Sequence, residues 1–578
     1  MTGPAAPKDP EKARPFFYIL KDKDIFGERQ KDGTGIQFIY ESDGRLINSA
    51  QITGNVTDKE ELTLLETVEG FGRLVHSIGV SVETDRPEET AEFVFQMYGK
   101  KDLYGGGTNL TTSLKCDGME HRIYLSDYRW TEDDHVPGQI KILFAAPERM
   151  GKVSVRLFLN DGYEAPPEEE DLFIDMHSEE YCGMISRSLL QLGNPYRIRK
   201  AIEKSKAGKE VTLAYIGGSI TQGAGAIPIH TECYAYKSFQ LFQNRFSTQN
   251  NVRFIKAGVG GTPSELGMIR FDRDVLREGE RPDIVVIEFA VNDEGDETKG
   301  VCYESLVRKV LKLPWKPAVV LLFSVFANDW NLQERLRPVG DLYDLPMVSI
   351  LNAVTPQFSL KCGEGRILSK NQFFYDIFHP NNTGHTIMAD CLQYLFERCD
   401  AAEPARVGTF VEGMTEEQIL SEKLFGPAVI GADFERIFLL DKKNRYVGAK
   451  IRTGSFTSTD IELQSVEMDG SLTQTPEFPY NWMYDGSRPQ MPGFEMEITC
   501  KSLFLIFKDS GEMDVGKADV FVNDVYCMTA DPHKNNWLHC NAVLLFWETE
   551  SRSHKVRITV TEEDQNKKFT ILGFGYTI

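Results

Sequence analysis

The chain has 578 residues, and 64 Lys and Arg against 86 Asp and Glu give it a formal net charge of −22. Such a length predicts about three to five domains. The acidity disfavours binding to phosphate backbones and to anionic membrane surfaces, and no apolar run approaches the ~20 residues needed to span a bilayer. We therefore expect neither a nucleic-acid-binding protein nor a membrane protein.

The first residues, MTGPAAPKDPEKARPFF, lack the apolar core of a signal peptide. The ten cysteines are scattered and form no CxxC pair, which favours reduced thiols over disulfides. We expect a cytoplasmic protein, or a secreted one if a leader has been removed. The sequence is also compatible with a homo-oligomer.

Residues 1–180 carry short apolar segments separated by Gly, Asp and Asn, such as those at 35–40, 139–144 and 152–158. Apolar and polar residues alternate within them, which is typical of antiparallel strands. This region is predicted to be a jelly-roll-like β-sandwich. A linker rich in Pro and acidic residues follows at 165–171.

Residues 183–402 have a different pattern. Nearly continuous apolar segments alternate with longer amphipathic ones that are expected to be helices. The predicted strands are 211–216, 252–255, 283–289, 318–323 and 347–350, and the predicted helices include 234–246, 304–313 and 382–396. Strands that are apolar throughout and alternate with helices predict a parallel sheet covered on both faces.

Residues 405–578 return to β-type patterns, with predicted strands at 502–507, 518–522, 542–546 and 556–560. We expect a second β-sandwich or jelly roll, which is a candidate carbohydrate-binding module. Its aromatic residues are either sugar platforms or core and inter-domain contacts, and we favour the latter. They are Phe478, Tyr480, Trp482, Tyr484 and Trp537.

Residues that could take part in catalysis follow the strands of the central region. Ser219 comes after the first strand in a Gly-Gly-Ser turn, Gly261 follows the second, and Asn292 follows the third. The carboxyl ends of parallel strands share one edge of the sheet, where ligands bind. We therefore expect the three residues to converge there, while Asp376 and His379 precede the last predicted helix.

These residues suit acyl transfer. Ser219 is the expected nucleophile, which needs a base to take its proton. His379 is the expected base, and Asp376 would hold the imidazole and stabilise its charged form. The backbone N–H groups of Ser219 and Gly261, with the side-chain amide of Asn292, would form the oxyanion hole.

No cofactor or metal is expected. His230, His533 and His539 do not show the spacing of zinc ligands. His385 is expected to pack or cap within the last helix, and Asp293 to hold the turn beside Asn292.

The Gly218-Ser219 turn, the Gly260-Gly261 turn, Asn292-Asp293 and Asp376-x-x-His379 resemble, in order and spacing, the four sequence blocks of the SGNH (GDSL-type) hydrolases. The resemblance covers about 200 residues. It implies a flavodoxin-like α/β/α domain. It also implies Ser219, Asp376 and His379 as the catalytic triad and Ser219, Gly261 and Asn292 as the oxyanion hole.

Two positions depart from the usual pattern. Gly-Asp-Ser is replaced by Gly217-Gly218-Ser219, and Gly-x-Asn-Asp by Ala290-Val291-Asn292-Asp293. Neither change removes a reacting group. The Gly-Gly-Ser-Ile-Thr variant resembles multidomain bacterial carbohydrate esterases that join the hydrolase domain to β modules.

This resemblance implies a serine esterase that removes O-acetyl groups from plant-type carbohydrate, such as acetylated xylan or mannan oligosaccharides. Trp330, after the fourth strand, is a candidate sugar contact at the same rim. Two alternatives stay open: a lipase or thioesterase acting on longer acyl esters, and a carbohydrate-binding protein with an inactive hydrolase domain.

Overall fold

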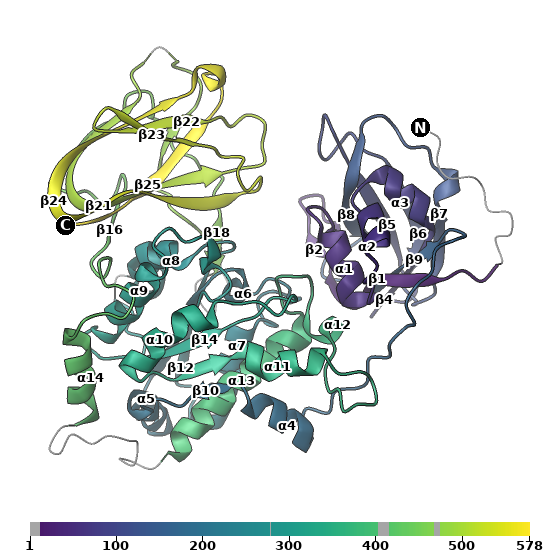
Figure 1. The fold of residues 1–578 in the computed structure, drawn as a ribbon, viewed down its shortest axis with the longest axis horizontal. Coiled ribbons are helices and arrows are strands. Elements are labelled where there is room, and N and C mark those ends of the chain that lie inside the picture. The colour runs from purple at the N-terminus through teal and green to yellow at the C-terminus, as the bar shows by residue number, and fades with distance from the viewer. Residues whose placement is uncertain (1–11, 278, 403–414, 468–473, 490) are drawn as a thin grey trace.

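The computed structural model describes residues 12–277, 279–402, 415–467, 474–489 and 491–578. It contains an amino-terminal β domain, a central α/β domain and a carboxyl-terminal β domain (Figure 1). In Figure 1 both β domains lie on the same side of the central domain, and helix α6 (Ser219–Gln222) lies on that side. The boundary expected between 402 and 405 adjoins residues outside the described ranges.

The amino-terminal domain is a sandwich of two antiparallel sheets around one apolar core. The predicted strands at 35–40, 139–144 and 152–158 are all present. One sheet has the order β1 (Phe16–Phe26), β9 (Met150–Leu159), β4 (Val75–Thr84) and β7 (His121–Tyr124). The other has the order β2 (Glu28–Arg29), β3 (Gly35–Tyr40), β8 (Asp134–Phe144), β5 (Thr90–Gly99) and β6 (Asn109–Lys115).

Three helices in this domain were not predicted: α1 (Arg45–Thr53), α2 (Lys59–Leu64) and α3 (Val68–Leu74). Local caps mark two of them. The Asp58 carboxylate accepts hydrogen bonds from the N–H groups of Glu60 and Glu61, and the Thr67 hydroxyl accepts one from Gly70. Each helix spans fewer than ten residues, which is too short for helical periodicity to stand out. The 165–171 segment has no helix or strand, as expected of a linker.

The central sheet has the order β10 (Leu189–Gln191), β15 (Met347–Ser349), β14 (Ala318–Phe323), β13 (Ile284–Glu288), β11 (Val211–Gly217) and β12 (Val252–Gly258). Only β10 runs antiparallel to its neighbour. Counted from β11, the five parallel strands have the order 2-1-3-4-5, which is the flavodoxin-like arrangement. The predicted fold of this domain is confirmed.

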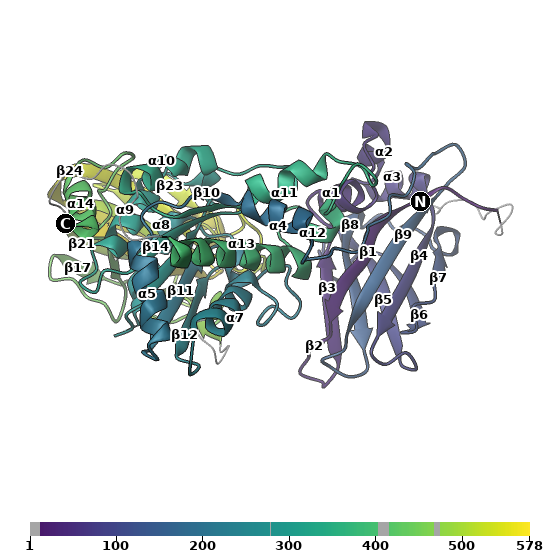
Figure 2. The same ribbon diagram turned by 90° about the horizontal axis from the view of Figure 1, so that it is seen from below.

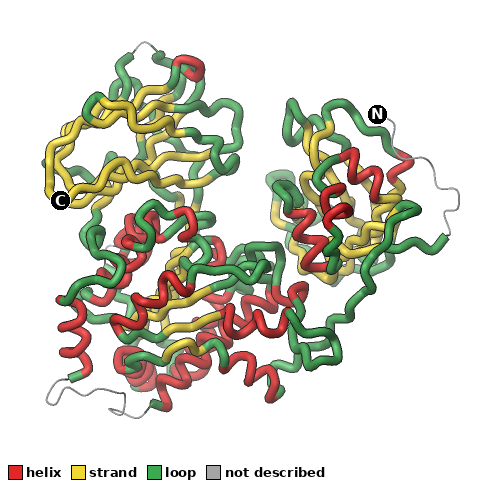
Figure 3. The backbone as a smooth tube through the Cα atoms, in the orientation of Figure 1, coloured by secondary structure: helices red, strands yellow, loops and turns green. Residues whose placement is uncertain are grey.

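Helices cover both faces of this sheet (Figure 3). In β11, Leu213 and Tyr215 belong to one buried cluster, and Ala214 and Ile216 to the other, because strand side chains alternate between faces. The first cluster includes residues of α4 (Glu179–Ser186), α5 (Tyr196–Lys206), α7 (Tyr234–Phe246), α11 (Ile350–Phe358), α12 (Lys370–Phe373) and α13 (Asn382–Ala401). The second includes residues of α8 (Ser264–Phe271), α9 (Val301–Leu311), α10 (Gln333–Tyr343) and α14 (Glu416–Phe425).

The carboxyl-terminal domain is an antiparallel sheet that curls around its own core (Figure 1). The segments 542–546 and 556–560, predicted as two strands, form one 22-residue strand, β24. Irregular register between β21 and β24 near Cys500 bends both long strands, which lets one sheet wrap around the core. The strands are β16 (Phe438–Leu440), β17 (Ala449–Arg452), β20 (Trp482–Tyr484), β21 (Phe494–Asp509), β22 (Ala518–Val522), β23 (Val525–Ala530), β24 (His539–Val560) and β25 (Phe569–Thr577), with β18 (Ser465–Glu467) and β19 (Gln474–Pro476) as a separate pair.

Three aromatic residues of the cluster at 478–484 are core residues, as favoured, and the fourth is not. Phe478, Trp482 and Tyr484 are buried, whereas Tyr480 is exposed. Among the described residues, no helix combines the length and apolar character required to cross a membrane.

Candidate active site

The register of the parallel strands brings the predicted residues to one edge. Gly217 of β11 is level with Gly258 of β12 and with Glu288 of β13. The turns that begin just after these three residues carry Ser219, Gly261 and Asn292. This edge includes the point where the strand order reverses, the usual ligand position in such sheets.

Ser219, His379 and Asp376 form a continuous hydrogen-bonded chain. His379 Nε2 lies 2.9 Å from Ser219 Oγ, and His379 Nδ1 lies 2.9 Å from each carboxylate oxygen of Asp376. In this arrangement Nδ1–H donates to the carboxylate, which leaves Nε2 free to accept the serine proton. The geometry is that of a nucleophile, its base and the group that orients the base.

Asp376 is held in its ionised form. Burial alone would raise the pKa of its carboxyl, but the charge of His379 and its hydrogen bond outweigh burial. Arg45 and the N–H of Phe378 act in the same direction, and the pKa falls to about 2. The carboxylate also accepts hydrogen bonds of 2.8 Å from the N–H groups of Phe378 and His379. Asp376 is therefore charged at any pH at which His379 acts as a base.

The loop before α13 fixes His379. The Tyr375 N–H donates to the His379 carbonyl at 2.8 Å, and Phe374 forms a β-bridge with Pro380. The Asn381 side chain then caps α13 by accepting from the Gly384 N–H. The histidine thus projects from a short closed turn held between two ordered segments.

The packing around Gly218 explains why glycine replaces the aspartate of the usual Gly-Asp-Ser. A Cβ at this position would lie 2.2 Å from Oδ1 of Asn292 and 2.6 Å from its Nδ2. The Asn292 amide therefore occupies the space that a side chain at 218 would need. This packing holds the expected oxyanion donor of Asn292 against the turn that carries Ser219.

The Gly261 turn depends on a backbone conformation that favours glycine and on a hydrogen bond to Asp293. Gly261 has φ +69°, a conformation that side-chain-bearing residues seldom adopt. Ser264, at the start of α8, comes shortly after Gly261. Its N–H donates a 2.7 Å hydrogen bond to the carboxylate of Asp293. Asp293 thus links the Asn292 turn to the Gly261 turn, the supporting role expected of it.

A buried polar chain runs beneath Ser219. Thr221 Oγ1 donates to Glu288 at 3.0 Å and lies 2.8 Å from the Tyr234 hydroxyl. Burial raises the pKa of Glu288 to about 7. His385 accepts from the Tyr234 N–H and donates to the Ala224 carbonyl, and burial lowers its pKa to about 3. His385 is a neutral packing residue, as predicted.

The carboxyl-terminal domain reaches the oxyanion turn, which was not predicted from the sequence. His539 Nε2 donates to the Gly261 carbonyl at 3.0 Å, and Gln464 Nε2 donates to the Gly260 carbonyl at 2.9 Å. The Trp537 ring lies beside both glycines. Trp537 is thus an inter-domain contact, as favoured. No local motif around 464 or 539 signals these long-range contacts.

Trp330 lies further from the triad. It is half-buried and stacks on Phe326 with ring centroids 5.7 Å apart. Phe326 contacts Phe378, the neighbour of His379. Trp330 therefore lies at the same rim, and the Phe326 ring stands between it and Phe378 in the loop that carries His379.

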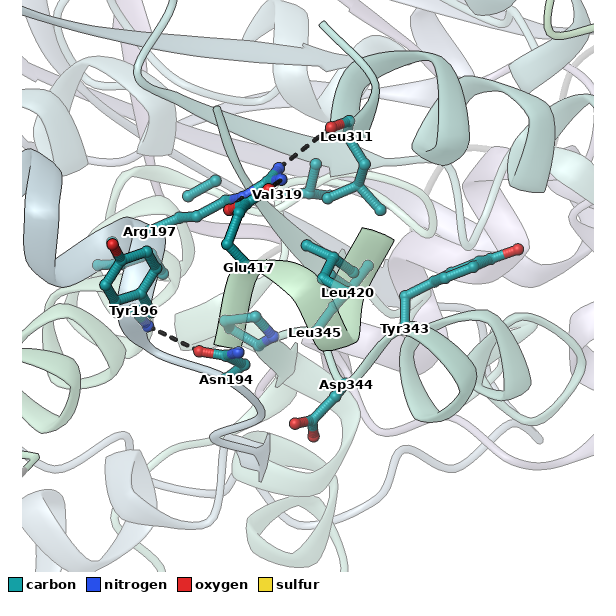
Figure 4. Close-up of a pocket in the computed structure, with 13 residues that line it drawn as sticks. Asn194, Tyr196, Arg197, Leu311, Val319, Tyr343, Asp344, Leu345, Glu417 and Leu420 are labelled. Carbon is teal, nitrogen blue, oxygen red and sulfur yellow. Dashed lines mark hydrogen bonds and ion pairs between the residues drawn. The ribbon is translucent and has the colours of Figure 1, made fainter. Parts of the chain in front are cut away.

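A separate hollow of about 20 Å³ lies at the opposite end of the sheet, near the first residue of β14 (Figure 4). There Arg197 forms an ion pair of 2.7 Å with Glu417 of α14. This contact fastens α14 to the central domain and adjoins none of the predicted site residues. In the described parts of the chain, no group of three or more His, Cys, Asp or Glu side chains is arranged to hold a metal.

Comparison with known families agrees with this geometry. Residues 215–387 match the profile of the GDSL-like lipase/acylhydrolase family, and this range contains all six predicted site residues. This match covers 173 of the 578 residues, and we call the part of the chain that carries it the GDSL-like domain. The predicted resemblance is thereby confirmed, and the GDSL-like domain is a hydrolase domain. No curated protein sequence matches the chain significantly.

Two solved structures share the fold over more than the GDSL-like domain. Both are of CEX, described as a two-domain esterase active on acetylated mannans, and one was co-crystallised with mannopentaose. The mannopentaose structure has 24% identity and a TM-score of 0.53, and the other has 23% and 0.54. Each alignment covers 68% of this chain and 98% of CEX.

Proposed function

We propose that the protein is a serine esterase that removes O-acetyl groups from plant-type carbohydrate, with acetylated mannan or xylan oligosaccharides as substrates. The proposal rests on the hydrogen-bonded chain from Ser219 through His379 to Asp376. Family membership of the GDSL-like domain supports ester hydrolysis. The fold shared with CEX, described as active on acetylated mannans, motivates the choice of substrate.

The reaction follows from the geometry. Ser219 Oγ attacks the ester carbonyl while His379 Nε2 takes its proton, and Asp376 stabilises the imidazolium. The N–H groups of Ser219 and Gly261 and the Asn292 amide stabilise the negative oxygen of the tetrahedral intermediate. His379 then protonates the departing sugar oxygen, which leaves an acetyl-serine. Water, activated by the same histidine, releases acetate.

The test is incubation of the protein with acetylated mannan and xylan oligosaccharides, followed by mass spectrometry. Stepwise loss of acetyl groups is expected. Ser219→Ala should lower kcat by at least ~10⁴-fold while the protein stays folded, because the nucleophile is lost. Ser359→Ala, at an exposed serine, is the matched control and should retain full activity.

The two alternatives predict different results. Faster turnover of nitrophenyl octanoate than of nitrophenyl acetate would indicate a lipase or thioesterase. Oligosaccharide binding without acetate release, together with no hydrolysis of nitrophenyl acetate, would indicate a binding protein.

A further inference from the structure

A cleft of about 640 Å³ lies between the amino-terminal sandwich and the GDSL-like domain, beside the triad. Asp376 and His379 line one end of it, together with the loop from Ala224 to His230. The opposite wall is formed by the amino-terminal sandwich, mainly by residues of β1, β2, β3 and α1. In Figure 2, β3 lies on the side of the sandwich nearest the GDSL-like domain.

The position of the cleft relative to the triad limits what it can hold. Nε2 of His379 must reach the leaving-group oxygen to protonate it, so the leaving alcohol lies on the histidine side. The carbonyl oxygen points instead toward Gly261 and Asn292, which do not line the cleft. A cleft that includes His379 but neither of those donors suits the alcohol part of the ester.

The wall formed by β3 carries two aromatic rings. Phe38 and Tyr40 are two residues apart, so both project from the same face of the strand. Their ring centroids lie 6.3 Å apart and their planes differ by 12°. Both rings line the cleft, and Tyr40 is 48% exposed. Exposed aromatic rings offer the electron-rich faces on which C–H groups of sugar rings stack, and these two rings are nearly parallel.

A buried carboxyl group stands beside these rings. Glu41 lines the cleft, is 2% exposed and accepts a 3.0 Å hydrogen bond from Ser49 through Oε2. Its Oε1 has no hydrogen-bond partner among the described residues. Burial raises the pKa of Glu41 to about 8, so the neutral carboxyl can both donate and accept. An unsatisfied buried polar atom is costly, and a sugar hydroxyl would satisfy it.

The sandwich is fastened to the triad loop, so this wall has a fixed position. Lys23 of β1 is buried and donates to the carbonyl oxygens of Phe374 and Asn371. The guanidinium of Arg45 in α1 lies 5.9 Å from the centre of the Phe378 ring. Direct contacts thus link the domain that carries the wall to the loop that carries His379.

We propose that Phe38, Tyr40 and Glu41 form a sugar-binding subsite that receives the glycan part of the substrate, the leaving alcohol of the ester. This inference rests on the proposed function and extends it, because it assigns substrate selection to the amino-terminal domain. Small esters that lack a glycan do not occupy this subsite.

The test compares two substrates in a Tyr40→Ala variant. On acetylated manno- or xylo-oligosaccharides, kcat/KM should fall about 3- to 10-fold, mainly through a higher KM. On ethyl acetate, whose leaving alcohol carries no ring that could stack on Tyr40, it should change less than about twofold. Phe425→Ala removes a ring that is 89% exposed at the end of α14 and should change neither value. An unchanged oligosaccharide kcat/KM, or equal losses on both substrates, would overturn the subsite.

A binding measurement separates this inference from the proposed function. Calorimetry with the inactive Ser219→Ala protein should detect mannopentaose or xylopentaose, and adding Tyr40→Ala should raise the Kd about 3- to 10-fold. If wild-type protein releases no acetate from oligosaccharides yet Ser219→Ala binds them through Tyr40, the proposed function fails and the subsite stands. If Ser219→Ala binds neither pentaose, the subsite is wrong.

Discussion

His539 in the carboxyl-terminal domain donates a 3.0 Å hydrogen bond to the backbone carbonyl of Gly261, in the turn that is expected to stabilise the oxyanion. The other ring nitrogen of His539 has partners within its own domain. His539 Nδ1 lies 3.1 Å from Asn535 Nδ2 and 3.4 Å from the buried carboxylate of Asp509. The Gly261–Thr262 peptide is therefore held by a residue 278 positions away in the chain, and Gln464 holds the Gly260–Gly261 peptide, which carries the Gly261 N–H. A domain without catalytic residues thus positions part of the active site.

Replacing His539 should affect the transition state more than substrate binding. His539→Ala is expected to lower kcat on nitrophenyl acetate by about 10-fold with little change in KM, since a misplaced oxyanion donor costs turnover. His539→Gln, which keeps a side-chain N–H donor, should recover part of the loss. His533→Ala is the matched control in the same domain and should behave like wild type. Equal activity of His539→Ala and wild type would refute the positioning role.

Restoring the usual family residue at 218 should damage this enzyme. A Cβ at 218 would lie 2.2 Å from Asn292 Oδ1, so Gly218→Asp must displace the Asn292 amide. Loss of one oxyanion donor typically costs ~10²–10³ in kcat. We expect a loss of that size for Gly218→Asp and a similar one for Asn292→Ala, measured with nitrophenyl acetate. A fully active Gly218→Asp protein would show that the amide is not needed where the structure places it.

The acid side of the pH profile should contain no titration of Asp376. His379 must be neutral to accept the Ser219 proton, whereas Asp376, with a pKa of about 2, stays ionised across the working range. The nearby buried carboxyls of Glu288 and Glu41 have raised pKa values of about 7 and 8, so their effects fall at higher pH. An increase in the slope of log kcat/KM between pH 4 and 5 would mean that Asp376 titrates as well.

The lowered pKa of Asp376 also affects how the stability of the fold depends on pH. Because the folded-state pKa of Asp376 lies below its ordinary value of 3.8, the ionised group stabilises the fold above that value. This contribution is lost as the pH falls from about 4 toward 2. In Asp376→Asn the free energy of unfolding should decline less over that interval, as acid titration followed by circular dichroism would reveal.

A buried arginine ties the ends of two central strands together. Arg270 is fully buried and donates to the carbonyls of Gly217 and Ala257 and to the Asp274 carboxylate, at 2.7–2.9 Å. Arg270→Ala should lower the free energy of unfolding by about 3–5 kcal/mol, since it leaves buried acceptors without a donor. Arg253→Ala breaks a half-exposed pair with Glu280 and should cost at most about 1 kcal/mol in the same denaturant titration. Equal costs would contradict this account of Arg270.

The sequence was most informative where the signal is local. Apolar segments of β11, β13 and β14 and the helix at 234–246 were predicted within a residue or two, because burial on both faces and helical periodicity leave their pattern within one segment. The candidate triad and Asn292 could also be predicted, since Ser219 and Asn292 lie shortly after strands and Asp376 and His379 lie shortly before a helix. By contrast, α1 to α3 are short, and β24 continues through a polar stretch that was interpreted as a break between two strands.

The sequence by itself determined which residues are candidates for catalysis, because those groups are recognised by residue type and by their order along a parallel sheet. Only the tertiary structure decided what surrounds them. His539 and Gln464 reach Gly261 and Gly260 across more than 200 residues, and Phe38 and Tyr40 reach the triad cleft from the other end of the chain. Such contacts arise from how the domains pack, and packing between distant segments leaves no periodic pattern or fixed spacing in the sequence.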